Sequence, residues 1–195
     1  MAGKQIQEDI RRALIELFGS ELVHSEWSVR RGAADTFSDV ASYAPRLDIA
    51  VGPFNTTHEG RQRDADAICS FEHPLVWRLK QEVAAQNYGS IYHNRNPRCL
   101  LAIEIEHSTS SKHILGAITN ASMLGLLGVV VGSAQHIRKV RRIHAYACKL
   151  KEVEKAHDDI FANVAVFEDQ EFQDLLGKVR HQIGRKVYGD RSRHR

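Results

Sequence analysis

Segments with strand-like and helix-like hydrophobic patterns alternate along this chain, and that alternation limits the fold more than any other feature. The strand-like segments are short and rich in apolar residues: 26–31, 37–43, 46–54, 99–106, 128–132 and 161–167. The helix-like segments carry apolar residues at helical spacing: 4–18, 74–87, 112–127, 133–154 and 169–183. Strands that alternate with helices favour a mixed β-sheet flanked by helices, which is an α/β fold.

The length and composition are those of one ordinary globular domain. A chain of 195 residues with 43% hydrophobic and 26% charged residues is neither collagen-like, nor of low complexity, nor wholly disordered. Its three cysteines form no CxxC pair, which excludes the usual thiolate zinc site. We predict one domain over residues 1–184, followed by a basic, flexible tail over residues 185–195.

No segment has the pattern of a signal peptide or of a membrane span. The N-terminal residues 1–19 are charged and amphipathic. The longest apolar stretch, Met123 to Val131, is far shorter than the ~20 residues that a membrane helix needs. We therefore expect a cytoplasmic protein with no membrane partner.

Positive charge is concentrated in two segments of a chain whose net charge is +3. Residues 176–195 carry a net charge of +6, which leaves −3 on the other 175 residues, and residues 138–151 contain six basic residues and no acidic one. Clustered positive charge indicates a polyanionic partner such as nucleic acid, although a solvated helix face has the same composition. The candidate nucleic-acid contacts in these two segments are Arg138, Arg142, Lys149, Arg185 and Lys186.

Three acidic residues on two apolar strands are the candidate catalytic site. In the segment CLLAIEIE, strand alternation puts Glu104 and Glu106 on one face, about 6.6 Å apart. Asp48 lies between apolar residues of the segment RLDIAV, so all three carboxylates converge if the two strands pair. Burying unpaired carboxylates is costly, and a hard divalent cation relieves that cost. An exposed strand with acids on its solvated face is the alternative.

This pattern resembles the PD-(D/E)xK nuclease superfamily, which includes many restriction endonucleases, over roughly residues 4–150. In that superfamily an N-terminal helix precedes a mixed sheet, one strand carries the Asp, the next carries (D/E)-x-K, and a helix and a strand follow. Asp48 in A-P-R-L-D matches the first acid, and Glu104 in I-E-I-E matches the second. Two departures are that Pro45 stands three residues before Asp48 and that Glu106 occupies the place of the lysine.

The resemblance implies a restriction-endonuclease-like fold and an endonuclease that hydrolyses DNA phosphodiester bonds with Mg²⁺, for which Mn²⁺ can substitute. Asp48, Glu104 and Glu106 would bind the metal, with Glu106 as a ligand or a general base. Lys112, as a catalytic cation, or His107, as a phosphate contact, would then supply the positive charge of the missing lysine. Double-stranded DNA is the expected substrate, and a homodimer would bring two active sites to the two strands.

Two other functions fit the same sequence. The chain could be an inactive nucleic-acid-binding module with the nuclease fold, in which the acids are structural. It could also be a protein whose basic tail binds an acidic protein partner.

Overall fold

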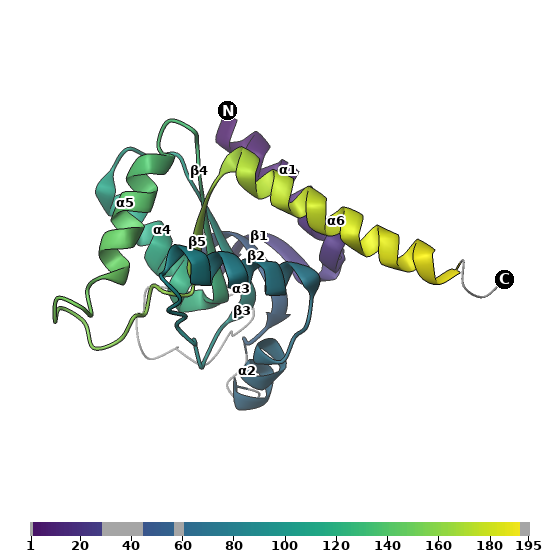
Figure 1. Ribbon diagram of the computed structural model, residues 1–195, viewed down its shortest axis with the longest axis horizontal. Coiled ribbons are helices and arrows are strands. Elements are labelled where there is room, and N and C mark those ends of the chain that lie inside the picture. Colours follow the sequence, from purple (N-terminus) through teal and green to yellow (C-terminus); the bar gives the residue numbers. More distant parts are fainter. Residues whose placement is uncertain (1, 29–44, 57–60, 192–195) are drawn as a thin grey trace.

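A five-stranded mixed β-sheet forms the centre of the computed structural model, which describes residues 2–28, 45–56 and 61–191 (Figure 1). The strands, which lie in the sheet in chain order, are β1 (Val23–Ser28), β2 (Arg46–Phe54), β3 (Cys99–Glu106), β4 (Gly125–Gly132) and β5 (Val164–Glu168). Neighbours among β1, β2 and β3 are antiparallel, whereas β3, β4 and β5 are parallel. The predicted α/β fold with a mixed sheet flanked by helices is therefore confirmed.

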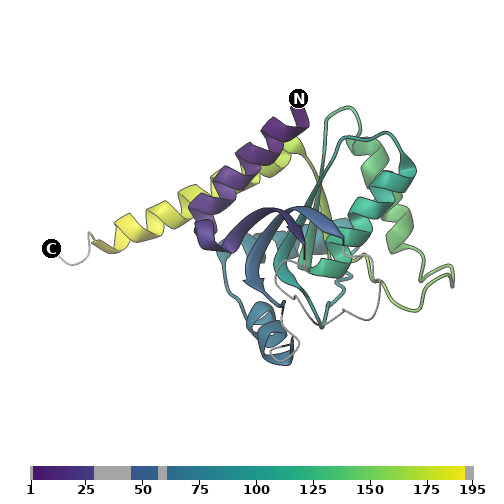
Figure 2. The ribbon, with the colours of Figure 1, turned by 180° about the vertical axis from the view of Figure 1, so that it is seen from behind.

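Helices cover both faces of this sheet (Figures 1 and 2). Apart from a short 3-10 turn at Ser20–Leu22, they are α1 (Ala2–Phe18), α2 (Arg61–Cys69), α3 (Pro74–Gln86), α4 (Ser111–Leu124), α5 (Ile137–Cys148) and α6 (Asp169–Arg191). Helices α1, α3 and α6 bury their apolar residues against one face, and α4 and α5 against the other. No helix within the described ranges has the length and apolar character needed to cross a membrane.

Strand β4, which lies between β3 and β5, shows how the sequence pattern produces these two layers. All eight of its residues are buried, as expected for a parallel strand covered on both faces. Val129 and Val131 belong to the core beneath α1, α3 and α6, while Val130 belongs to the core beneath α4 and α5. Alternate side chains of one strand thus serve two separate hydrophobic cores.

Several boundaries differ from the predicted ones. The strand predicted at 128–132 begins at Gly125, because Gly125 already pairs with Cys99 of β3, and α4 ends at Leu124 instead of reaching 127. Helix α5 is shorter than the predicted span 133–154. Helix α2 was not predicted, since it buries only Ala65 and Ile68 and therefore has little apolar periodicity.

The first strands and the last helix also differ from those predicted from the sequence. The first strand covers 23–28 instead of 26–31, and the strand predicted at 37–43 lies outside the described residues. Helix α6 continues to Arg191, so the predicted domain boundary at 184 falls inside this helix. The far end of α6 extends beyond the sheet, away from α4 and α5 (Figure 1).

A glycine in β4 allows α4 to pack closely on the sheet. A Cβ atom at Gly128 would lie 2.8 Å from Cγ2 of Val164 and 2.9 Å from the carbonyl carbon of Ala121 in α4. The second of these is a backbone atom, so only a shift of the helix could relieve the clash. The absence of a side chain at Gly128 therefore determines how near α4 lies to β4.

We predict that Gly128→Ala lowers the free energy of unfolding by about 1–3 kcal/mol, because α4 must move outward. Gly116→Ala, in the middle of the same helix, is the matched control: nothing lies within 4 Å of its added Cβ. That variant should gain roughly 0.5–1 kcal/mol from helix propensity. Urea unfolding of both variants measures the difference, and equal effects would contradict the close helix–sheet contact.

Candidate acidic site

The register between β2 and β3 places two acidic residues side by side. Ile49 pairs with Ile103 in this antiparallel ladder, so Asp48 stands opposite Glu104. Residues directly opposite each other in an antiparallel pair point to the same face of the sheet. On its other side Glu104 is in register with Val130 of β4, which packs beneath α4 and α5. Asp48 and Glu104 therefore form an acid pair on the face that α4 covers.

Hydrogen bonds hold both members of the acid pair in place. Asp48 Oδ2 accepts from the backbone N–H of Ile105 at 2.7 Å, and Glu104 Oε1 accepts from Nδ2 of Asn120 in α4 at 3.0 Å. The two carboxyl groups are close enough that each shifts the pKa of the other. Two neighbouring carboxyl groups can form a hydrogen bond only when one of them carries a proton.

Burial and mutual repulsion make the acid pair hard to ionise. Glu104 is only 7% exposed, and burial, followed by the charge of Asp48, raises its pKa to about 8. Burial also raises the pKa of Asp48. The hydrogen bond from Ile105 partly opposes this rise, and the negative charge of Glu26 adds to it. Without a cation the pair therefore keeps a proton at neutral pH.

Glu106, the third acid of the predicted trio, accepts a hydrogen bond from the turn after β3. It lies two residues after Glu104 on β3 and is equally buried, but its Oε1 accepts from the backbone N–H of Ser108 at 2.5 Å. Within the described ranges, no three His, Cys, Asp or Glu side chains gather as a ready metal site. The turn after β3 binds the third carboxylate, and the convergence of Asp48, Glu104 and Glu106 on one metal ion stays a prediction.

A third acid that the sequence analysis missed lies beside Asp48 on β1. Ser25 pairs with Ile49 and Trp27 with Leu47, so the intervening Glu26 stands at the level of Asp48. Glu26 has a φ of +49°, a left-handed conformation that costs a residue with a side chain roughly 1–2 kcal/mol. No local sequence signal marks this position, since it depends on strand register and on a backbone irregularity.

Two polar residues bind the Glu26 carboxylate. Arg46 Nε lies 2.8 Å from Glu26 Oε2, and Gln7 of α1 donates to Glu26 Oε1 at 3.4 Å. The same Gln7 amide donates to the carbonyl oxygen of Asp48 at 3.0 Å. An exposed ion pair of this kind contributes only about 0–1 kcal/mol, which does not by itself account for the left-handed backbone.

Neither residue predicted to replace the motif lysine contacts the acid pair. Lys112 lies exposed in the first turn of α4, and no hydrogen bond or ion pair joins it to the described part of the chain. The His107 ring packs against Gly3 of α1, where a Cβ atom would lie 3.1 Å from its Cδ2. Its Nε2 is buried without a partner among residues 2–28, 45–56 and 61–191.

The predicted basic contacts are spread over the molecule. Arg138 and Arg142 lie exposed on α5, which begins just after the carboxyl end of β4. In the same first turn, Lys139 Nζ donates to the carbonyl oxygen of Thr109 in the turn that follows β3. The first half of α5 therefore lies at the edge of the sheet where the acid pair is found.

Lys149 and the C-terminal residues lie elsewhere. Lys149 follows the last turn of α5, and its Nζ lies 6.0 Å from the centroid of the Tyr88 ring. This position is close to the amino end of β5, at the opposite edge of the sheet. Arg185 is exposed on α6, and the side chain of Lys186 lies outside the described residues. Of the predicted basic contacts, Arg138 and Arg142 thus lie at the same edge of the sheet as the acid pair, whereas Lys149 lies at the opposite edge.

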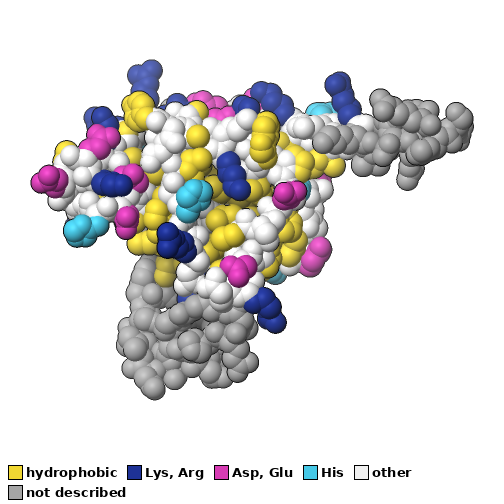
Figure 3. Space-filling model, turned by 60° about the horizontal axis from the view of Figure 1, so that its bottom comes forward, with side chains coloured by type: hydrophobic (Ala, Val, Ile, Leu, Met, Phe, Trp, Pro, Cys, Tyr) yellow, Lys and Arg dark blue, Asp and Glu magenta, His cyan; other side chains and the backbone are white. Residues whose placement is uncertain are grey.

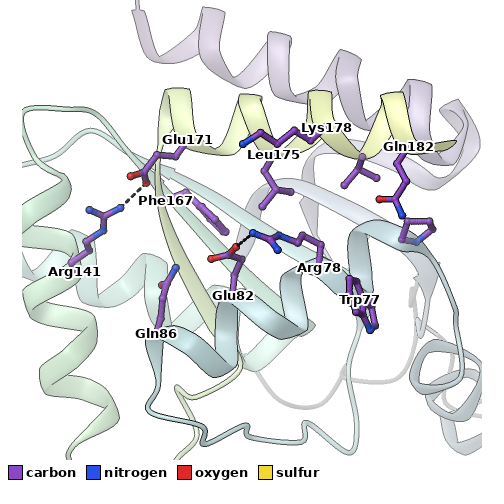
Figure 4. A pocket seen from close by; sticks show the side chains of 12 residues that line it. Trp77, Arg78, Glu82, Gln86, Arg141, Phe167, Glu171, Leu175, Lys178 and Gln182 are labelled. Carbon is purple, nitrogen blue, oxygen red and sulfur yellow. Dashed lines mark hydrogen bonds and ion pairs between the residues drawn. The ribbon is translucent and has the colours of Figure 1, made fainter. Parts of the chain in front are cut away.

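A hollow of about 540 Å³ lies between α3 and α6, on the other side of the sheet from α4 (Figure 4). Two ion pairs occur at its wall, Arg78 with Glu82 at 2.7 Å and Arg141 with Glu171 at 2.6 Å. None of the predicted site residues lines it. Seen from the side on which α2 lies, acidic and basic side chains are interspersed without a block of one sign (Figure 3).

We predict that Glu104→Gln removes a pH dependence of stability. The folded protein holds a proton on Glu104 up to a pKa of about 8, whereas an unfolded glutamate loses it near 4.5. Stability of the metal-free wild type therefore falls as pH rises through this window, by an amount on the order of a few kcal/mol. Thermal unfolding from pH 5 to pH 8 should show Glu104→Gln gaining stability relative to wild type as pH rises, and Glu152→Gln, an exposed control, tracking wild type. Parallel curves for Glu104→Gln and wild type would contradict the buried acid pair.

Comparisons of the chain with family models, with curated proteins and with solved structures find no match. Inferences about the chemistry of this site therefore depend on its geometry and on the sequence pattern described above.

Proposed function

We propose that this protein is a Mg²⁺-dependent endonuclease that hydrolyses DNA phosphodiester bonds at the Asp48–Glu104 pair. The observation that carries the proposal is that the buried carboxyl group of Glu104 lies opposite the half-buried one of Asp48 on the adjacent strand, with the pKa of Glu104 raised to about 8. Such an arrangement is costly as an ordinary core feature, and a hard divalent cation would relieve it.

The residues present fit a magnesium ion. Mg²⁺ in proteins is commonly bound by one or two carboxylates, with waters and substrate phosphate oxygens filling the other positions. Asp48 and Glu104 would bind it, and Mn²⁺, which prefers similar oxygen ligands, could replace it. Glu106 would join them only if its carboxylate left the Ser108 N–H.

The chain's own residues have separable roles in this proposal. When bound, the metal supplies an activated water and neutralises charge on the phosphate. Glu104 must lose its proton to bind a cation, so the affinity for the cation should rise with pH. Asn120 donates to one oxygen of Glu104 and thereby fixes the direction of the carboxyl group.

The order of elements supports a restriction-endonuclease-like fold. Helix α1 precedes the sheet, β2 carries Asp48, β3 carries Glu104, and α4 and the parallel strand β4 follow. This is the order that the resemblance to the PD-(D/E)xK superfamily implies. Double-stranded DNA stays the proposed substrate, and a homodimer stays the proposed assembly.

We predict that Asp48→Asn and Glu104→Gln each abolish Mg²⁺-dependent cleavage of duplex DNA and weaken Mn²⁺ binding at least tenfold, because each removes an anionic ligand. Titration calorimetry with Mn²⁺ and a plasmid-cleavage assay with and without EDTA measure the two effects. Glu152→Gln, an exposed acid outside the site, is the control and should behave as wild type.

Glu106→Gln separates a two-acid site from a three-acid site. Retained Mn²⁺ affinity and retained cleavage would show that Asp48 and Glu104 suffice. The wild type could instead bind DNA without binding Mn²⁺ and without cutting the DNA. That result would make the protein a nucleic-acid-binding module with structural acids.

The first half of α5 is the proposed nucleic-acid contact beside the acid pair. We predict that Arg138→Glu with Arg142→Glu weakens DNA binding and lowers the slope of log K against log salt by ~0.9 per lost phosphate contact. Lys149→Glu, just after the end of the same helix and at the opposite edge of the sheet, is the matched control and should change the slope little. A slope unaffected by the double reversal would assign these arginines to the solvated surface.

A further inference from the structure

We propose that Arg46 supplies the positive charge that contacts a backbone phosphate of nucleic acid beside the acid pair, and that Glu26 positions it. This inference rests on the proposed nuclease function, and it deepens it by assigning the role of the missing motif lysine. Arg46 therefore takes the role that the sequence pattern assigned to Lys112 or His107.

The position of Arg46 relative to the acid pair is the first argument. It begins β2, two residues before Asp48, and strand alternation directs both residues to the same face of the sheet. The Arg46 side chain is 65% exposed, so a phosphate arriving from solvent can reach it.

The contact with Glu26 is the second argument, because it orients the guanidinium group without consuming it. Arg46 forms an ion pair with Glu26, in which Nε lies 2.8 Å from Oε2. No contact of its two terminal amino groups is found with the described residues. These two groups are the ones that would bind phosphate oxygens side by side, a geometry that arginine offers and lysine does not.

The backbone at Glu26 is the third argument. Its φ of +49° is sparsely populated for a residue with a side chain, and such residues gather at functional sites. Gln7 joins this carboxylate to the main chain of Asp48, since its amide donates to both. Arg46 is thereby connected through Glu26 and Gln7 to the strand that carries the acid.

A role in phosphate contact predicts effects opposite to those of a metal ligand. Removing a positive charge next to a cation site should leave Mn²⁺ affinity unchanged or tighter, whereas removing Asp48 or Glu104 should weaken it. Loss of a group that stabilises charge in the transition state typically costs about 10²-fold in rate. Arg46→Gln should therefore cut DNA roughly 10²-fold more slowly while it binds Mn²⁺ at least as tightly as wild type.

The experiment compares four single variants of the full chain after thermal unfolding has shown that they fold. Arg46→Lys keeps the charge but not the paired donors, so its rate of DNA cleavage should lie between those of wild type and Arg46→Gln. Glu26→Gln should lose a smaller part of the rate, since it only positions Arg46. Arg12→Gln is the matched control: Arg12 is also 65% exposed and lies 4.0 Å from an acid, Asp9, on α1. It should cut DNA at the wild-type rate.

DNA binding separates this inference from the proposed function. In EDTA, the Asp48→Asn variant with and without Arg46→Gln is titrated with a DNA duplex at several salt concentrations. A phosphate contact by Arg46 predicts that the slope of log K against log salt falls by ~0.9 with the second change. If wild type neither binds Mn²⁺ nor cuts, the nuclease proposal fails, and this slope still tests Arg46.

Three outcomes would overturn the inference. Arg46→Gln could cut DNA at the wild-type rate, it could lose Mn²⁺ binding together with cleavage, or it could leave the salt slope unchanged. The second outcome would make Arg46 a structural support of the acid pair. The first and third outcomes would show that Arg46 only forms an ordinary surface ion pair with Glu26.

Discussion

The opposition of Asp48 and Glu104 across β2 and β3 is the interaction on which the rest of the site depends. A buried carboxyl group and a half-buried one at the same level of a sheet are hard to ionise together without a compensating positive charge. The pKa of Glu104 is raised to about 8, and the backbone N–H of Ile105 and the side chain of Asn120 donate to the two carboxyl groups. Each of these is lost or rearranged if either strand shifts by one residue, so the site and the register stabilise one another.

The close packing of α4 is the second condition. Gly128 lets this helix approach β4, and Asn120, next to Ala121 at the point of closest approach, then reaches Glu104. Since Asn120 donates to Glu104, it favours the ionised carboxylate and opposes the effect of burial on its pKa. The close packing of α4 at Gly128 therefore affects the ionisation of Glu104, and with it the affinity of the acid pair for a cation.

Positive charge lies beside Asp48 on β2 and also on α5. Arg46 lies close enough to affect Asp48, while Arg138 and Arg142 lie on α5 at the same edge of the sheet. A nucleic acid that followed α5 would bring its backbone toward the acid pair, where a metal ion and Arg46 could act on one phosphate. The hollow between α3 and α6 lies on the other side of the sheet and has no part in this arrangement.

The sequence by itself determined the alternation of strands and helices, the bounds of the β2 and β3 strands, and the presence of Asp48 and Glu104 within them, because these follow from local apolar patterns. Only the tertiary structure decided that Glu106 binds the turn at Ser108, and that Glu26 and Arg46 stand beside Asp48. Those outcomes depend on strand register and on backbone geometry at single residues. Local patterns do not encode either of them, since they arise from contacts between segments that are distant in the chain.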